Sequence, residues 1–385
     1  MSPPQLYIQL HAQLSQWIQP KDKRHLVGFA ENVAAILQSE SGCLSRWLSY
    51  LSHRDCKARS HMERLSYFAH NPKITPEIFY APLVRQFLKA WEGMSILLTL
   101  DTSMLWDQYC LIAVCFVWGG RSFPLAQKVM EHGSATVGYE DYQCVLEMAL
   151  AVLPPNCQVI LLADRGFEHG ELIRWLQAQS WSWAIRAKSD LKITLANGQT
   201  RHVSELLPPT DEAYLFSDIT ILKDIQCHLA TANVSLAGEP WAVISEEPAS
   251  LQTFKLYGCR FGGIEPHFKD YKSAGFEIIR SKLRNDEALS CLLMLLAAAT
   301  IIAISLAVIV ITQNRLAFLD WHGQRGLSFF QLGLRELKQL CYQRLPLPTL
   351  VNLPRCNPPP AYASRKKKER IDTRIEFSKV TVFLS

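Results

Sequence analysis

The first ninety residues repeat apolar side chains with the spacing of amphipathic helices. Apolar residues recur three and four positions apart in four segments, residues 6–18, 26–37, 44–51 and 78–91. This period gives each helix one apolar face that must be covered by other parts of the chain. We therefore expect residues 1–92 to form a helical N-terminal domain.

A short break between the second and third segments is typical of a helix-turn-helix. Residues 39–42 (Ser-Glu-Ser-Gly) separate the two segments, and Arg46 would lie on the second helix. Four further basic residues follow it: Arg54, Lys57, Arg59 and Arg64. In a helix-turn-helix such side chains contact DNA. Any helical bundle contains short glycine turns as well, so plain helical packing is an equal alternative for this segment.

Residues 93–190 have the pattern of a mixed α/β domain. Strands are predicted at residues 95–104, 109–118, 122–130, 159–164 and 182–188, and helices at residues 142–153 and 168–180. The order is three strands joined by hairpins, followed by helix, strand, helix and strand. This is the order of the ribonuclease-H-like fold, although a generic α/β domain shares part of it. We expect a ribonuclease-H-like mixed sheet with helices, of which residues 93–190 form the first part.

The chain beyond this core divides into three parts. Residues 191–250 alternate like strands and contain an Asn-Gly pair typical of a two-residue hairpin, which predicts an inserted β domain. Residues 251–345 return to helical patterns and are expected to complete the core. Residues 346–385 are rich in proline and contain a basic run, which predicts an irregular basic tail.

One segment is apolar enough to cross a membrane. Between Ala288 and Asn314 there is no charged residue, and almost every side chain is apolar. The length passes the test for a transmembrane helix, and a helix buried on all sides in a large core has the same composition. A core helix would have to be covered by the sheet, by residues 316–340 or by a second subunit.

Cysteine usage and net charge say something about the cellular setting. The eleven cysteines are scattered singly without a Cys-x-x-Cys pair, which is typical of reduced thiols in a cytosolic protein. The N-terminus lacks the pattern of a signal peptide, which favours the same location. A net charge of +5 is compatible with a polyanionic partner, but many proteins that bind no nucleic acid carry as much.

Three acidic residues are candidates for a metal site. Asp101 and Asp164 each follow a run of apolar strand residues, and sheets of this class place their sites at the carboxyl ends of strands. A single such aspartate is often a helix cap, but two of them indicate shared cations, because burying an unpaired charge is costly. Glu265, in the first turn of a helix expected to open at Gly262-Gly263, is the natural third ligand. Three carboxylates can hold two Mg²⁺ ions, which prefer oxygen ligands and support phosphoryl transfer.

The segments around these acids resemble the motifs of a known family. LTLDTSM, LLADRGF and YGCRFGGIEPHFKDYKSAGF are similar to the motifs of DDE transposases of the insertion-sequence-four family. In that family the third motif is a Tyr, two residues, an Arg, three residues, a Glu, six residues and a Lys. The matching residues here are Tyr257, Arg260, Glu265 and Lys272. This chain has four residues, not three, between its Arg and its Glu, and the resemblance runs over residues 96–330.

The resemblance implies a ribonuclease-H-like catalytic core interrupted by a β-rich insertion. It implies that Asp101, Asp164 and Glu265 are catalytic and hold two Mg²⁺ ions, for which Mn²⁺ substitutes. It implies DNA contacts by three residues: Tyr257, Arg260 and Lys272. The implied activity is cut-and-paste transposition, which is cleavage and strand transfer at the ends of the protein's own insertion sequence through a hairpin intermediate. The implied partners are element-end DNA, target DNA and a second subunit in the synaptic complex.

Other functions remain open at the level of sequence. A ribonuclease-H-like nuclease that does not join DNA would share the core, and so would a catalytically inert DNA-binding relic. A membrane-anchored protein is the third alternative. In some members of the family a Trp of the insertion stacks on a flipped base, and Trp241 is the candidate here, although its apolar strand (WAVIS) favours a core position. We expect a bacterial cytoplasmic enzyme that acts at the nucleoid and has no membrane partner.

Overall fold

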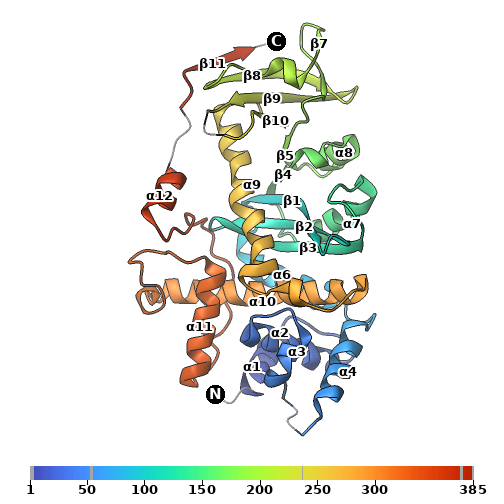
Figure 1. Ribbon diagram of the computed structural model, residues 1–385, viewed down its shortest axis with the longest axis vertical. Coiled ribbons are helices and arrows are strands. Elements are labelled where there is room, and N and C mark those ends of the chain that lie inside the picture. The colour runs from blue at the N-terminus through green and yellow to red at the C-terminus, as the bar shows by residue number, and fades with distance from the viewer. Residues whose placement is uncertain (1–3, 53–54, 236, 373–375, 384–385) are drawn as a thin grey trace.

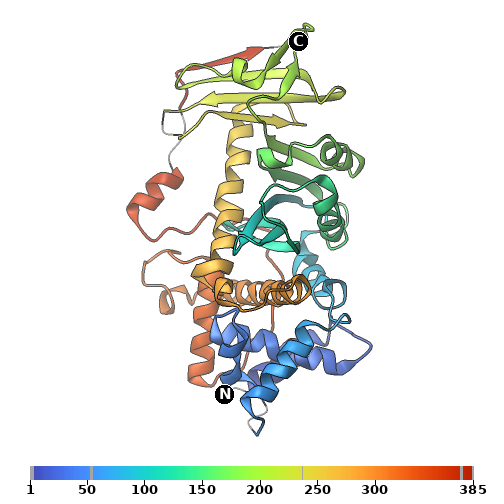
Figure 2. The ribbon, with the colours of Figure 1, turned by 45° about the vertical axis from the view of Figure 1, so that its right-hand side comes forward.

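The structure, a computed structural model, describes residues 4–52, 55–235, 237–372 and 376–383. Figures 1 and 2 show three tiers along its long axis: helices at one end, a sheet that reaches the other end, and a crosswise helix between them. The crosswise helix is α10 (Asp286–Thr312). A second long helix, α9 (Leu251–Lys269), runs along the sheet toward α10.

The N-terminal tier is helical. Its longest helix, α2, begins after Asp22, whose side chain accepts a hydrogen bond from the backbone N–H of Arg24, and ends at Glu40 in the left-handed conformation. The buried face of α2 packs against α1 and α10. The tier contains α1 (Pro4–Leu14), α2 (Lys23–Ser39), α3 (Leu44–Trp47), α4 (Ala58–Ala69), α5 (Pro76–Phe79) and α6 (Ala81–Leu88), with 3₁₀ turns at Leu48–Tyr50 and Lys89–Trp91.

The second helix of the predicted helix-turn-helix is cut short. The helix α3 has only four residues and continues as a 3₁₀ turn. The indole N–H of Trp47 donates to the carbonyl of Ser41 at 2.7 Å, which folds the segment back onto its own turn. A recognition helix must present several side chains along a DNA groove. One helical turn does not do this, so the structure does not contain the predicted motif in that form.

The middle tier has the predicted strand order. Its strands are β1 (Ser95–Leu105), β2 (Tyr109–Trp118), β3 (Arg121–Glu131), β4 (Gln158–Ala163) and β5 (Ser182–Arg186). The first three form an antiparallel meander, whereas β4 is parallel to β1 and β5 is parallel to β4. The helices α7 (Tyr139–Leu150) and α8 (Gly170–Ala178) precede β4 and β5. The spatial order β3-β2-β1-β4-β5 confirms the ribonuclease-H-like mixed sheet.

The predicted β-rich insertion forms strands that continue the same sheet. They are β6 (Lys192–Thr194), β7 (Thr200–His202), β8 (Glu212–Ile221), β9 (Ile225–Asn233) and β10 (Trp241–Ser245). The strand β10 pairs antiparallel with β5, with Val243 opposite Arg186, so the sheet runs on as β5-β10-β9-β8-β6-β7. The expectation of an inserted β domain is therefore corrected to an extension of the core sheet. Pairing satisfies the backbone groups that β5 would otherwise expose at an edge.

The helix α9 begins earlier than the glycine pair predicted. It starts at Leu251, and the side chain of Ser250 caps it by accepting from the backbone N–H of Gln252. Interior glycines cost about 1 kcal/mol each relative to alanine, and burial against the sheet outweighs this. Its buried positions repeat with helical spacing: Phe254, Tyr257, Arg260, Ile264 and Phe268. A π-helical turn (Asp270–Ala274) and a 3₁₀ turn (Ile278–Arg280) follow.

The apolar run forms the core helix α10. It is long and apolar enough to cross a membrane, and it is the only such helix among the described residues. Of its most apolar window, 94% is buried inside the protein, which favours a core helix. It packs against β3, α2, α4, α6 and the following helix α11 (Phe329–Gln343), after a 3₁₀ turn at Leu316–Phe318. The predicted cover by the sheet and by residues 316–340 is thus confirmed.

The C-terminal tail is more ordered than predicted. It contains a helix, α12 (Arg365–Asp372), and a strand, β11 (Lys379–Phe383). The strand β11 pairs in parallel with β8 at the far end of the sheet, with Val382 opposite Leu215. Alternating apolar residues in β11 find a partner edge that no local pattern indicates, so the expectation of an irregular basic tail is wrong for these two segments.

Candidate active site

Two of the three predicted acids lie side by side on the sheet. Leu100 and Ala163 are the last paired residues of the parallel strands β1 and β4. Asp101 and Asp164 come directly after them, so both carboxylates lie at the same level of neighbouring strands. Asp164 follows the end of β4, as predicted. Asp101 does not close its strand, because β1 continues to Leu105 along β2.

The side chain of Arg260 bridges the two aspartates. Its Nη2 lies 2.7 Å from Oδ2 of Asp101 and 3.9 Å from Oδ2 of Asp164. The hydroxyl of Tyr257 donates to Oδ1 of Asp164 at 3.4 Å, and the backbone N–H of Thr102 donates to Oδ1 of Asp101 at 2.9 Å. The helix α9 therefore turns its buried face onto both carboxylates. Tyr257 and Arg260, predicted to contact DNA, are buried against acids in this arrangement.

Burial and charge oppose each other at this site. Burial raises the pKa of the Asp101 carboxyl above its ordinary value, and the Arg260 guanidinium and the Thr102 hydrogen bond reduce that rise. Burial by itself would lower the pKa of Arg260. Asp101, together with Tyr257 and Asp164, outweighs this and keeps the pKa raised. A buried ion pair costs solvation free energy that close geometry must offset. The carboxylate pair therefore requires a cation, and here the guanidinium supplies it.

Glu265 does not join the two aspartates. It lies on the exposed stripe of α9 together with Lys255, Cys259, Gly262 and Lys269. An α-helix turns by about 100° per residue, so five residues place Glu265 about 140° around the axis from Arg260. Ile264, one residue earlier, occupies the buried position that follows Arg260 by one turn. The prediction that Glu265 points at the aspartates is wrong for this arrangement.

Lys272 is also displaced from its predicted position. The seven-residue spacing from Glu265 was expected to place both on one helical face. Lys272 instead falls in the π-helical turn Asp270–Ala274, where the α-helical period is interrupted. It is half-buried, and burial lowers the pKa of its ammonium group, with Asp107 opposing this.

The metal site implied by the resemblance is only partly present. The carboxylate oxygens of Asp101 and Asp164 are suitable ligands for a divalent cation, but the guanidinium of Arg260 already pairs with both carboxylates. The third ligand faces away, and among the described residues there is no group of three or more His, Cys, Asp or Glu side chains that could hold a metal ion. The arrangement therefore does not fit two metal ions.

Several basic residues of the N-terminal tier that were predicted to contact DNA already form ion pairs with glutamate side chains. Arg46 contacts Glu277 at 2.7 Å. Two more pairs lie within the tier, Arg59–Glu63 and Arg64–Glu31, both at 2.9 Å. Lys57 is exposed, and Arg54 lies outside the described residues. Exposed ion pairs contribute about 0–1 kcal/mol, so Arg59, whose pair with Glu63 is exposed, can exchange its partner for phosphate at little cost. Glu31 is buried, so Arg64 would leave a buried carboxylate unpaired if it did the same.

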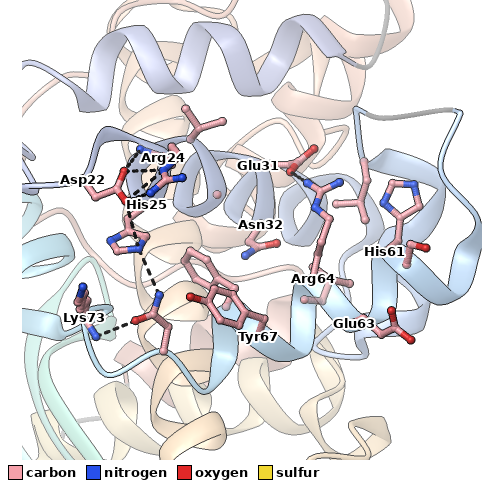
Figure 3. A pocket seen from close by; sticks show the side chains of 17 residues that line it. Asp22, Arg24, His25, Glu31, Asn32, His61, Glu63, Arg64, Tyr67 and Lys73 are labelled. Carbon is pink, nitrogen blue, oxygen red and sulfur yellow. Dashed lines mark hydrogen bonds and ion pairs between the residues drawn. The ribbon is translucent and has the colours of Figure 1, made fainter.

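A large cavity lies in the same N-terminal tier. Figure 3 shows the side chains that line it, which come from α2, α4 and the segments beside them. Its volume is about 710 Å³. Its cationic and anionic side chains are Arg24, Arg64, Lys73, Asp22, Glu31 and Glu63. Three positive charges face three negative ones, and two of the acids are already paired with arginines of the cavity. The cavity therefore shows no preference for an anion and is separate from the aspartate pair.

One buried ion pair at the end of α9 was not expected from the sequence. Asp270 is buried and contacts Arg121 of β3 at 2.5 Å. Burial raises the pKa of Asp270 to about 6, although Arg121 acts in the opposite direction. The pair fixes the end of α9 on β3. Its partners are far apart in the sequence, so no local pattern reveals it.

Glu168 should make the stability of the protein depend on pH. Burial raises its pKa to about 7, opposed by the hydrogen bond from the backbone N–H of Lys188 at 2.6 Å. The folded protein favours the neutral carboxyl of Glu168. Its contribution to stability is therefore fully present below the unfolded pKa of about 4.5, and it is lost as the pH rises through about 7. We expect Glu168→Gln to raise the free energy of unfolding by about 2 kcal/mol at pH 8 and by little at pH 4.5.

Urea unfolding at the two pH values measures this difference. The exposed Glu171→Gln is the matched control. Because Glu171 lies in the first turn of α8, this substitution should lower the stability at pH 8 by at most about 1 kcal/mol, opposite in sign to the effect of Glu168→Gln. Equal stability of Glu168→Gln and the unchanged protein at pH 8 would contradict the assignment.

Comparison with known proteins supports one class. Residues 114–302 match the family described as "Transposase DDE domain". This range contains Asp164, Tyr257, Arg260 and Glu265, and it begins shortly after Asp101. The match supports a DDE transposase, and such enzymes generally use divalent metal ions.

The other two comparisons add less. No curated protein matches the chain. Among solved structures, the chain is similar to a piggyBac transposase, determined by cryo-electron microscopy as a synaptic complex with hairpin DNA. The identity is 12%, the TM-score is 0.42, and the alignment covers 97% of this chain and 87% of that chain.

Proposed function

We propose that this protein is a DNA transposase that cuts the ends of its own insertion sequence and joins them to target DNA. The observation that carries the proposal is the position of Asp101 and Asp164, side by side on parallel strands of a ribonuclease-H-like sheet. The match of residues 114–302 to a transposase DDE domain supports the same conclusion.

The proposed reaction is a series of exchanges at phosphorus. Water breaks a phosphodiester bond at the element end and leaves a 3′-hydroxyl. This hydroxyl attacks the opposite strand, so that one phosphate–oxygen bond forms and another breaks, giving a hairpin. After the hairpin is reopened, the same hydroxyl attacks target DNA. No covalent bond to the protein is needed, so a serine or tyrosine nucleophile is not required.

The proposed cofactor is Mg²⁺, with Mn²⁺ as a substitute, held first by Asp101 and Asp164. Both side chains offer hard oxygen ligands of the kind that Mg²⁺ prefers. The proposed third ligand is Glu265, and the proposed DNA contacts are Tyr257, Arg260 and Lys272. These four side chains would need to move before they could take these roles. The three DNA-contact candidates are buried or half-buried, and Glu265 faces away from the aspartates.

The proposed partners and setting follow from the same reaction. Both element ends must be held together before cutting, so we propose a dimer on DNA, with residues 1–92 as the DNA-binding domain. The proposed location is the bacterial cytoplasm at the nucleoid. All eleven cysteines are free, as expected for a reducing compartment.

A catalytically inert DNA-binding relic is the second candidate. The outward direction of Glu265 favours it, because a fixed helix would leave the site one carboxylate short.

One incubation separates the candidates. Purified protein is mixed with Mg²⁺, labelled DNA that carries both flanking ends of its own gene, and a plasmid target. A transposase releases the element, leaves hairpin ends and gives joined products. Cleavage without joined products would identify a nuclease, and binding without cleavage would identify the relic.

A further inference from the structure

The C-terminal tail is held on the turn between β2 and β3, although the two are more than two hundred residues apart. The indole N–H of Trp118 donates to the carbonyl of Cys356 at 2.6 Å. The backbone N–H of Gly119 donates to the side-chain oxygen of Asn357 at 2.8 Å. These two hydrogen bonds fix the start of the tail beside the first residue of β3.

The loop between α10 and α11 (residues 313–328) joins the same turn and tail through one arginine. The guanidinium of Arg325 donates to the carbonyl of Gly119 at 3.3 Å and to the carbonyl of Pro359. It also stacks on the ring of Phe329, 4.3 Å from the ring centre. The carbonyl of Arg325 accepts from the backbone N–H of Tyr362 at 3.2 Å. Three segments that are distant in the sequence therefore meet at Arg325.

Each of these segments brings a cation to the meeting point. Arg121 is the first residue of β3, Arg325 lies in the loop, and Lys367 lies in the first turn of α12. Burial lowers the pKa of Arg325 to about 10, helped by Arg121 and opposed by Asp320. Partial burial lowers the pKa of Lys367, and the charges of Arg121 and Arg325 lower it further. Like charges act in this way only over short distances, so the three side chains form one cation cluster.

Carboxylates do not balance the charge of the cation cluster. Among the described residues, neither Arg325 nor Lys367 forms an ion pair with a carboxylate. The oxygens of Asp320 accept hydrogen bonds from backbone N–H groups of their own loop. Asp270 pairs with Arg121 through Nη1 alone. Positive charges held together repel one another, and a bound anion relieves this repulsion.

The cation cluster lies close to the aspartate pair along α9. Nη1 of Arg121 also donates to the carbonyl of Pro266 at 3.2 Å. Pro266 follows Arg260, which bridges the aspartates, by six residues, or about 9 Å along the helix axis. This length is about three phosphate spacings along one DNA strand. In Figures 1 and 2, α12 lies on the side of α9 that faces away from α7 and α8.

We propose that Arg121, Arg325 and Lys367 form a binding site for the phosphate backbone of DNA. The site holds a phosphate a few nucleotides from the one at the aspartates. Guanidinium groups suit phosphate because their planar fork matches two of its oxygens, and the ammonium of Lys367 adds a third donor. The inference rests on the proposed function only for the choice of DNA as the polyanion. Contacts to phosphate position a duplex without reading its sequence.

Two neighbouring lysines of α12 provide a matched test. Lys366→Ala and Lys367→Ala each remove one charge from an exposed position of the same helix, but their side chains point about 100° apart. Labelled duplexes, one with the element end and one of unrelated sequence, are titrated with protein at several salt concentrations. Lys367→Ala should weaken binding of both duplexes about tenfold, and Lys366→Ala at most about twofold. The slope of log K against log salt should become shallower by about 1 for Lys367→Ala alone.

Arg325→Gln tests the half-buried member of the cluster. We expect it to weaken binding of both duplexes by about tenfold or more. The double variant Arg325→Gln, Lys367→Ala should lose less affinity than the product of the two single losses, because both side chains contact the same phosphate. The midpoint of urea unfolding shows whether Arg325→Gln is folded. If it is not, the comparison of Lys366→Ala with Lys367→Ala still decides.

Reversing a charge tests the cation cluster without DNA. Lys367→Glu places a carboxylate beside Arg121 and Arg325, so it should raise the midpoint of urea unfolding at low salt. Lys366→Glu changes the net charge equally in the same helical turn, but it should raise the midpoint less. High salt should reduce the difference between the two variants, because it screens charges near the surface. Equal midpoints at low salt would overturn the cluster.

The outcomes separate this site from the proposed function. Equal affinities of Lys366→Ala and Lys367→Ala, with cleavage by the unchanged protein, would reject the site and keep the transposase. A specific loss of affinity in Lys367→Ala, without cleavage by the unchanged protein, would support the site and reject the proposed reaction. A loss confined to the element-end duplex would overturn the assignment to the backbone. If the unchanged protein binds neither duplex, both proposals are wrong.

Discussion

Replacing Asp164 by asparagine should abolish DNA cleavage while leaving DNA binding nearly unchanged. Asparagine keeps the size of the side chain but removes one of the two negative charges at the junction of β1 and β4. A site that works through carboxylate charge loses several kcal/mol, so we expect a loss of about a thousandfold or more. Asp101→Asn should have an equal effect on cleavage. It should also destabilise the fold, because the buried Arg260 loses its nearer partner.

Single-turnover cleavage of labelled element-end DNA measures the rate, and a gel-shift titration with the same DNA measures binding. Asp107→Asn is the matched control, because Asp107 is exposed on the turn that follows β1. It has a positive φ, which asparagine tolerates as well as aspartate does. A variant Asp164→Asn that cuts at the rate of the unchanged protein would reject the aspartate pair as the active site.

Replacing Gly333 by alanine should weaken the fold strongly. A Cβ atom at this position of α11 would lie 1.7 Å from the carbonyl oxygen of Ala303 in α10. That oxygen belongs to the backbone of a buried helix, so the two helices would have to separate. Overpacking of a tight core typically costs about 1–3 kcal/mol and sometimes more, and we expect the upper end of this range. The midpoint of urea unfolding measures the effect.

The same substitution in α9 is the control. Gly258 is helical and has open space around its Cβ direction. Because alanine has the higher helix propensity, Gly258→Ala should stabilise the protein by up to about 1 kcal/mol. If the change in stability is negative at Gly333 and positive at Gly258, the close approach of α10 and α11 is what makes Gly333 necessary. If Gly333→Ala unfolds at the midpoint of the unchanged protein, the described contact between these helices is wrong.

The packing of α10 also explains why composition could not distinguish a core helix from a membrane helix. A helix that is apolar on all sides needs an apolar surrounding, and lipid or protein can provide it. The surrounding is supplied here by β3, α2, α4, α6 and α11, which come from segments far apart in the chain. Only the folded arrangement shows which surrounding the helix has.

Local patterns determined most of the sheet and the two aspartates of the candidate site. Strand alternation and helix periodicity extend over a few residues, so the order of β1 to β5 could be derived from the sequence. The sequence also placed Asp101 and Asp164 after matching positions of two neighbouring parallel strands, although β1 continues past Asp101. The helical character of the first 92 residues and of the apolar run had the same local basis.

The tertiary structure alone decided the rest of the site. Whether Glu265 faces inward depends on the number of residues in every turn of α9, and one extra residue rotates it by about 100°. The partners of Arg46 and Asp270, Glu277 and Arg121, lie more than a hundred residues away in the chain. The pairing of β10 with β5 also depends on distant segments. A free strand edge can pair with any strand that the fold places beside it, and the sequence of β5 does not specify which one. Such contacts have no local pattern, since they are fixed by the packing of distant segments and not by the residues beside them.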